Sequence, residues 1–164
     1  MQYIRIPEER MRVLIGAKGA TKKEIEKKTK CKINVSEGEI TVEGEALDEW
    51  VGKDVVHAIG RGFSPEKAAF LLKDGFVFEM IELGDYANTP SSMERLRGRV
   101  IGERGRTRKF IERTTGCMLS VYGKTVGFIG SYDGVALAKE AVSMLLAGSR
   151  HGSVYRMLEK KRTR

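Results

Sequence analysis

Two segments of the chain combine closely spaced glycines with a cluster of cations, which is the composition of a phosphate-binding loop. Each has an apolar pair, a Gly-x-x-Gly motif and a basic stretch, at residues 14–23 and 100–109. A glycine has no Cβ, so backbone N–H groups can approach an anion closely, and the positive end of a following helix favours an anion at the same place. Lysine and arginine add a salt-dependent attraction to nucleic acid that does not depend on its sequence. We therefore predict that each loop grips the backbone of a single-stranded nucleic acid, and the candidate contact residues are Ile15, Gly16, Ala17, Lys18, Gly19, Lys22 and Lys23 in the first loop and Ile101, Gly102, Glu103, Arg104, Gly105, Arg106, Arg108 and Lys109 in the second.

The two loops belong to a longer internal repeat. Gly102 follows Gly16 by 86 positions, and Gly105 follows Gly19 by the same number. The same offset brings identical residues together from Leu14 to Gly44 with no gap, which indicates an internal duplication. The identical pairs include Lys23 and Lys109, Glu26 and Glu112, Thr29 and Thr115, Cys31 and Cys117, Val35 and Val121, and Gly44 and Gly130.

Each copy shows the same order of elements: strand, helix, loop, helix, strand, strand, helix. In the first copy the alternation and helical periodicity predict strands over 2–7, 31–35 and 40–42 and helices over 8–15, 21–29 and 47–58. In the second copy they predict strands over 76–83, 118–122 and 125–129, and the last helix over 137–146. Two capping boxes, Thr21 with Glu24 and Ser91 with Glu94, are expected to begin helices. The predicted fold class is α+β, with two modules that each have a three-stranded antiparallel sheet covered on one face by three helices.

These elements define four parts of the chain. We expect a first module over residues 1–62, a connecting helix over 63–74, a second module over 75–147 and a basic C-terminal tail over 148–164. In the connecting segment, Pro65 after Ser64 is typical of a helix start. Apolar residues in the tail give it a weak helical face, and the tail is a solvated end, a contact for nucleic acid, or both.

The strand that follows the second helix of each copy offers a floor for bases. Ile33 and Val35 in the first copy, and Leu119 and Val121 in the second, are the apolar candidates, although alternate residues of a strand face opposite sides of a sheet. Asn34 would contribute to base selectivity only if it faces the groove, because selectivity depends on hydrogen bonds to Watson–Crick edges.

Composition limits the classes of function. The 164 residues carry a net charge of +8 with a pI near 9.6, which favours an acidic partner such as nucleic acid. No apolar run approaches the length of a membrane span. Two cysteines without a cysteine and histidine cluster predict neither a disulfide framework nor a metal site. We expect a cytoplasmic monomer that needs no metal and no cofactor.

No catalytic constellation is visible in the sequence. A phosphate-binding ATPase loop needs Gly-x-x-x-x-Gly-Lys followed by Ser or Thr, whereas Gly19 and Gly105 are followed by Ala20 and Arg106. No nucleophile is paired with a base, and no carboxylate pair has a supporting motif. We therefore expect a protein that is not an enzyme.

Three further side chains favour packing over chemistry. Cys31 and Cys117 occupy equivalent strand positions, which predicts two similar packing sites rather than a redox or metal pair. Trp50 could stack on a base, but its helical position beside Val51 favours packing.

The paired loops within a duplicated module resemble the KH domain in its eukaryotic-type order, with the last helix at the C-terminal end. The residues that carry the resemblance are Ile15 to Gly19 and Ile101 to Gly105. KH domains clamp about four nucleotides of single-stranded RNA or DNA beside the GXXG loop, so the resemblance implies the same here. Glu103 departs from this expectation, because an acidic residue at a variable loop position suits a phosphate less well than a neutral or basic one.

The whole chain resembles archaeal tandem-KH ribosome-assembly factors, on residues 102–109 and on the tail from Gly148 to Arg156. This resemblance implies binding near the 3′ end of small-subunit rRNA, assistance in subunit assembly and pre-rRNA processing, and contact with a 3′-end processing endonuclease or another assembly or initiation factor. An alternative is a protein-interaction scaffold, in which one module docks such a protein instead of RNA. Both loops look intact, so the sequence does not indicate which module would have changed its role.

Overall fold

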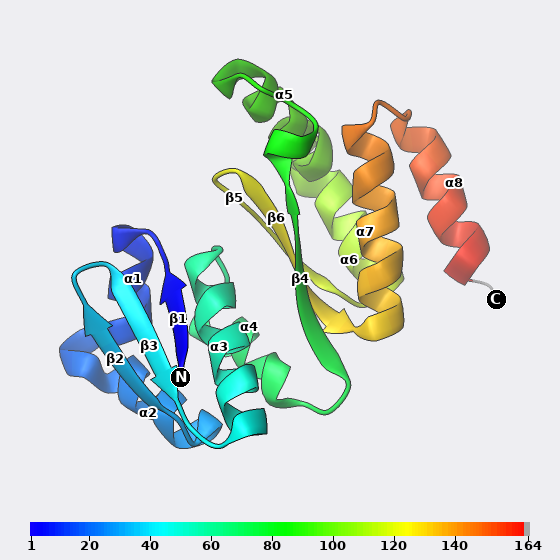
Figure 1. The fold of residues 1–164 in the computed structure, drawn as a ribbon. Helices are drawn as coiled ribbons and strands as arrows, with labels where there is room; N and C mark the ends of the chain where they lie inside the picture. Colours follow the sequence, from blue (N-terminus) through cyan, green and yellow to red (C-terminus); the bar gives the residue numbers. More distant parts are fainter. Residues whose placement is uncertain (163–164) are drawn as a thin grey trace. The chain divides into compact units, whose positions relative to one another are not determined.

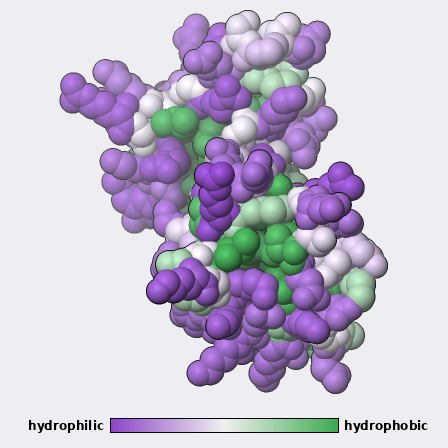
Figure 2. Space-filling view, turned by 90° about the vertical axis from the view of Figure 1, so that its left-hand side faces the viewer, coloured by the Kyte–Doolittle hydropathy of each residue, from purple (hydrophilic) through white to green (hydrophobic). Residues whose placement is uncertain are grey.

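The structure is a computed structural model that describes residues 1–162, and the chain divides into two compact units at Phe76 and Val77. The division agrees with the duplication, because each unit contains one GXXG loop, one sheet and one set of helices. The face drawn in Figure 2 is largely hydrophilic, with hydrophobic residues in limited groups, as the high content of charged residues predicts.

The first unit has a three-stranded sheet with helices on one face (Figure 1). Its strands lie in the order β1-β3-β2, and β3 pairs antiparallel with both neighbours, with Tyr3 opposite Thr41 and Ile33 opposite Val42. The elements are β1 Gln2–Arg5, α1 Glu8–Ile15, the 3₁₀ turn η1 Ala17–Gly19, α2 Ala20–Thr29, β2 Lys32–Ser36, β3 Glu39–Glu43, α3 Ala46–Gly60, α4 Pro65–Ala68 and η2 Ala69–Leu72.

The second unit repeats this arrangement with the strand order β4-β6-β5. β5 and β6 pair antiparallel, with Leu119 opposite Phe128. The elements are β4 Phe76–Glu82, η3 Leu83–Asp85, α5 Pro90–Ile101, η4 Glu103–Gly105, α6 Arg106–Thr115, β5 Met118–Tyr122, β6 Thr125–Ser131, α7 Tyr132–Leu146 and α8 His151–Arg162. The predicted α+β fold with two three-stranded antiparallel sheets is confirmed.

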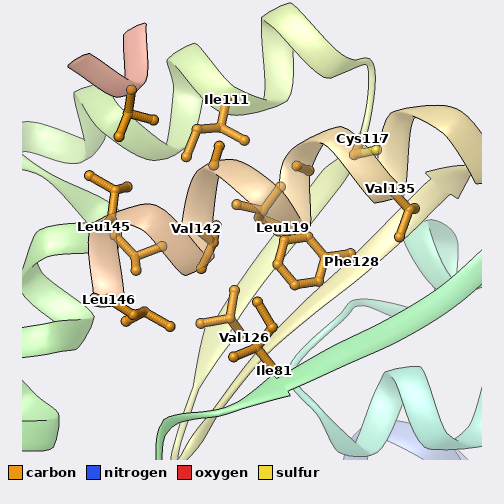
Figure 3. Close-up of a cluster of buried hydrophobic side chains, with 14 of the residues drawn as sticks. Ile81, Ile111, Cys117, Leu119, Val126, Phe128, Val135, Val142, Leu145 and Leu146 are labelled. Atoms are coloured by element: carbon orange, nitrogen blue, oxygen red, sulfur yellow. The ribbon is translucent and has the colours of Figure 1, made fainter. Parts of the chain in front are cut away.

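The core of the second unit lies between its sheet and its helices (Figure 3). Phe128 and Val126 of β6 and Leu119 of β5 point towards Ile111 of α6 and Val142 of α7. All five side chains are buried. This packing fixes α6, and therefore the GXXG loop at its start, against the edge strand β5.

The basic tail is a structural part of the second unit rather than a solvated end. Residues 151–162 form α8, which packs against α6 and α7 (Figure 1). Val154 and Leu158 are completely buried in the same core cluster. The sequence pattern predicted the helical face, but its burial depends on an apolar surface that α6 and α7 present only after folding.

The segment predicted as a connecting helix is the first unit's equivalent of α8. Gly62 and Gly148 are 86 positions apart and have φ values of 101° and 104°. After this turn α4 begins at Pro65 and α8 at His151, which are again separated by 86 positions. α4 and η2 pack against α3, and η2 also contacts α2. The repeated unit therefore contains a fourth helical segment that sequence identity alone did not reveal.

Both predicted capping boxes are wrong. α2 starts directly after the loop at Ala20, so Thr21 lies inside its first turn and Gly19 is the N-cap. In the second unit the capping box is formed by Thr89 and Ser92, with Pro90 at the first helical position. Ser91 is not the N-cap because Pro90, whose fixed φ favours the first position of a helix, places the N-cap at Thr89.

Candidate nucleic-acid interface

The two GXXG loops have the same backbone conformation. Gly16 and Gly102 have φ/ψ of 71°/−176° and 74°/171°, and each donates its N–H to the carbonyl four residues earlier, at 2.9 and 2.8 Å. The third loop residue lies in the left-handed region in both, with φ/ψ of 54°/28° at Lys18 and 57°/25° at Arg104. A left-handed conformation is unfavourable for a side chain of this kind, so its presence in both copies marks these positions as functional candidates.

Two different requirements explain the glycines. A Cβ at Gly16 would lie 2.1 Å from Thr21 Oγ1, and a Cβ at Gly102 would lie 2.2 Å from Thr107 Oγ1. The first glycine of each loop is therefore required because the chain passes directly over a threonine of the next helix. The second glycine, by contrast, borders open space: no heavy atom lies within 4 Å of a Cβ built at Gly19.

The N-termini of α2 and α6 face this open space. Gly19 and Gly105 are the N-cap residues, so no side chain caps the first turn of either helix. The first turns also contain no acidic residue. The 3₁₀ turn before each helix already accepts the first N–H groups, because Gly19 and Gly105 donate to Gly16 and Gly102, and Ala20 and Arg106 donate to Ala17 and Glu103. The positive end of the helix dipole favours an anion at each of these two sites.

The predicted cations fall into two groups. Lys18, Lys23, Arg104, Arg106 and Lys109 are exposed around the loops. The equivalent residues Lys22 and Arg108 instead form ion pairs within their helices, with Glu26 at 3.2 Å and Glu112 at 3.9 Å. The exposed group supplies the charge for a ligand, while the second group supports the helix.

Glu26 and Glu112 have the same structural role in the two units. Glu26 accepts a hydrogen bond from the Ile33 N–H at 2.9 Å, and Glu112 accepts one from the Leu119 N–H at 3.0 Å. Burial raises the pKa of Glu26, but the Ile33 N–H and Lys22 together outweigh this effect, so its pKa lies below the usual range. Each carboxylate therefore ties its helix to the outer edge of a sheet.

The strand residues predicted as a groove floor divide between core and surface. Ile33 has no exposed area and Leu119 only 2%, so both belong to the core and cannot contact a ligand without a rearrangement. Val35 and Val121 are half-buried. Asn34 is exposed between the inward-facing Ile33 and Val35, so it lies on the opposite face of the sheet from the helices.

The loops differ in what surrounds them. The second loop has Glu103 and Arg106, both exposed, where the first has Ala17 and Ala20. Among the residues that the structure describes, a hydroxyl of the fourth helical segment reaches the second loop alone. Tyr155 Oη lies 2.9 Å from Thr107 Oγ1, and the Tyr155 ring packs on Phe110 at 4.4 Å between centroids.

Sequence reasoning missed the residues that hold the second loop from α8. His151 Nε2 lies 2.9 Å from the Arg99 carbonyl oxygen, and the Arg99 guanidinium donates to the carbonyls of Leu145, at 3.0 Å, and Ser149. Thr21 and Thr107 were visible as an identical pair at the same offset, and that signal could have identified them. His151 and Tyr155 lie in the tail segment that carries the family resemblance, but nothing in the sequence indicated their contact with the loop, because they act through tertiary contacts.

The cysteines are packing residues in both units, as predicted. A Cβ at Gly44 would lie 2.9 Å from Cys31 Sγ, and a Cβ at Gly130 would lie 2.6 Å from Cys117 Sγ. Burial raises the pKa of both thiols. Trp50 differs from its prediction: its side chain is 58% exposed, with Lys53 Nζ 4.6 Å from the ring centroid.

Two further features of residues 1–162 concern other classes of function. No helix there is long and apolar enough to cross a bilayer. Within the same residues, no group of three or more histidines, cysteines, aspartates and glutamates is placed to hold a metal ion.

Comparison with known proteins adds family information to this geometry. Residues 77–163 match the model of the eukaryotic-type KH domain (KH-domain type I), and residues 1–49 match the KH domain model. A KH domain-containing protein of Methanocaldococcus jannaschii is 44% identical, over 99% of this chain and 74% of its own length. The pre-rRNA-processing protein PNO1 of Chaetomium thermophilum is 29% identical, and the aligned residues cover 77% of this chain and 49% of that protein.

Solved structures of relatives are similar along nearly the whole chain. Dim2p from Pyrococcus horikoshii is 49% identical with a TM-score of 0.90, covering 97% of this chain and 98% of that one. A complex described as a/eIF2alpha–aDim2p–rRNA from the same organism contains a chain that is 48% identical, with a TM-score of 0.91 and coverage of 99% and 93%.

Proposed function

This chain belongs to the eukaryotic-type (type I) KH family, and from that premise we propose that it clamps single-stranded RNA at its two GXXG loops. The RNA is the small-subunit rRNA near its 3′ end, and the protein assists subunit assembly and pre-rRNA processing in the cytoplasm without catalysing a reaction itself. Its relatives are described as a pre-rRNA-processing protein and as part of an rRNA complex, which supports this choice of RNA.

The observation that carries the proposal is the repeated loop geometry. Two helices of ten residues begin with glycine N-caps, no acidic residue in the first turn, and exposed cations on both sides. A phosphate at either site would face the positive end of a helix and be attracted by the exposed cations. Because these features occur twice in the same backbone conformation, an RNA clamp explains them better than a simple turn between helices.

A salt titration tests the proposal. The intact chain is titrated with labelled single-stranded RNA of the 3′ end of small-subunit rRNA, with a scrambled RNA of the same composition, and with the duplex form. We expect the single strand to bind best, with an affinity that falls linearly in log–log form between about 50 and 200 mM salt. Equal affinity for duplex and single strand, or no binding at low salt, would contradict the proposal.

Contact with a protein partner is a second candidate function, favoured by an apolar pair on α3. Leu47 is 83% exposed and Trp50 is 58% exposed, one helical turn apart. The equivalent residues of the second unit are Asp133 and Ala136, so this pair exists only in the first. A related chain forms a complex that includes a/eIF2alpha, and we propose the corresponding initiation-factor subunit as the partner. A processing nuclease is the alternative occupant.

Variants of this pair separate the two functions. Trp50→Ala should weaken capture of the initiation-factor subunit and leave RNA affinity unchanged, since Trp50 lies outside the loops. Tyr132→Ala, at an exposed aromatic residue in the second unit, is the matched control. Equal effects of both substitutions on the protein partner would contradict the assignment to α3.

A further inference from the structure

A cleft of about 410 Å³ opens beside the second GXXG loop, between α5 and α8. Its α5 wall is formed by positions spaced three or four residues apart, so they share one face of the helix. The cleft reaches the loop at Gly102 and Glu103 and the start of α6 at Arg106. The lining residues are Arg95, Gly98, Arg99, Gly102, Glu103, Arg106, Thr107, His151 and Tyr155.

The cleft lies on the opposite side of α5 from the edge strand β5. Arg97 donates a hydrogen bond to the Gly123 carbonyl in the β5–β6 turn, at 2.8 Å. Arg95 and Arg99 each lie two residues from Arg97, which corresponds to a rotation of about 200° around the helix. Both side chains therefore start from the face of α5 opposite to Arg97. The cleft is therefore separate from the surface between α6 and β5, and the loop lies between the two.

The charge and the wall of the cleft suit a phosphodiester. Three arginines line it against one glutamate, and Arg95 and Arg106 are exposed. The guanidinium of Arg99 is already committed to two carbonyls and fixes the wall. On the α8 side, the contacts of His151 with Arg99 and of Tyr155 with Thr107 hold the opposite wall in place. The site is thus bounded by ordered contacts and open towards the loop.

We propose that this cleft is a second phosphate-binding site, which takes the RNA backbone after it leaves the second GXXG loop, with Arg95 and Arg106 as the cationic ligands. The proposal rests on the proposed RNA binding and extends the contact of the second unit beyond the usual KH length. The first unit lacks both cationic ligands, because at the positions of Arg95 and Arg106 it carries Glu9 and Ala20.

Gly98 provides a test that changes no charge. It is exposed in the interior of α5, and no heavy atom lies within 4 Å of a Cβ built on it. Gly98→Leu should therefore fold and place a side chain in the cleft from the α5 wall, while Gly98→Ala leaves the cleft open. We expect Gly98→Leu to weaken binding of an RNA of about eight nucleotides severalfold and to leave a minimal RNA of about four nucleotides, the length a KH domain clamps, unchanged. Gly98→Ala should bind both as the wild type does.

A second test removes one positive charge from the cleft. Arg95→Ala should weaken the longer RNA and reduce its salt slope by about one, whereas Arg113→Ala, at an exposed arginine of α6 outside the cleft, should do neither. The cleft assignment is overturned if Gly98→Leu matches Gly98→Ala, or if Arg95→Ala matches Arg113→Ala, while the wild type still binds both RNAs. Loss of all binding by the wild type would instead overturn the proposed function.

Discussion

An aspartate at the second glycine of each loop gives the sharpest test of the clamp. The double substitution Gly19→Asp with Gly105→Asp places a carboxylate where the phosphate is expected, and the structure has space for it. No heavy atom lies within 4 Å of a Cβ at Gly19, and only Lys109 Cε, at 3.8 Å, does so at Gly105. The same change at Gly16 would collide with Thr21 Oγ1 at 2.1 Å, so it would test folding instead of binding.

The size of the effect follows from charge and backbone conformation. Two unit charges about 4 Å apart interact by about 1 kcal/mol in water and by about 4 kcal/mol at the effective dielectric constant of a protein surface. For exposed loops we expect the lower part of this range, about 1–2 kcal/mol per loop, which corresponds to a loss of affinity of about 5- to 30-fold for each. The φ values of 77° and 75° add a backbone strain that aspartate and asparagine tolerate better than most residues.

The matched control is the double variant with asparagine at both positions, which has the same strain and nearly the same shape without the charge. RNA affinity is measured by fluorescence anisotropy at low salt, and unfolding by chemical denaturation. The expected result is much weaker binding by the aspartate variant than by the asparagine variant, at similar stability. If the two variants bind RNA equally well, the phosphate is not held at these loops.

Three further predictions concern single residues. Glu103→Gln should raise affinity about fivefold for RNA of any sequence, because it removes about 1 kcal/mol of repulsion from an exposed loop. A loss of affinity confined to certain RNA sequences in the same binding assay would show that Glu103 reads a base. Because the pKa of Glu26 is lowered in the folded state, its stabilisation is complete above its ordinary pKa of about 4.5 and is lost as the pH falls through the lower folded value. Glu26→Gln should therefore weaken the acid dependence of unfolding below about pH 4.5, and an unchanged acid limb would contradict the bond to Ile33. Gly130→Ala should lower the free energy of unfolding, measured by thermal melts, by about 1–3 kcal/mol through overpacking against Cys117. Adding Cys117→Ala should restore part of this stability. Independent, additive effects of the two substitutions would show that the two residues do not meet.

Local patterns and the duplication predicted most of the fold. The predicted helix over residues 8–15 coincides with α1, and the predicted hairpin of the second copy begins at the same residues as β5 and β6. The alignment at one offset also placed both loops correctly. These features depend on local periodicity and on glycine, which the sequence displays directly.

The errors have two physical causes, which are the local geometry of the loops and dependence on distant parts of the chain. Thr21 matched a capping motif, but its hydroxyl packs against Gly16, because the N-cap of α2 is Gly19, two residues earlier. The helical position of Trp50 beside Val51 favoured packing, whereas its side chain is 58% exposed on α3. Burial of Val154 and Leu158 in α8 likewise depends on α6 and α7.

The carboxylates that cap the edge strands also affect how this protein can associate with other chains. β2 and β5 are outer strands, and an outer strand with open N–H groups is a template for strand addition and aggregation. An incoming strand at Ile33 or Leu119 would have to displace Glu26 or Glu112 from the amide it already holds. Intermolecular β-pairing is thus opposed at these two edges, and a peptide that docks by extending a sheet would have to use β1 or β4 instead.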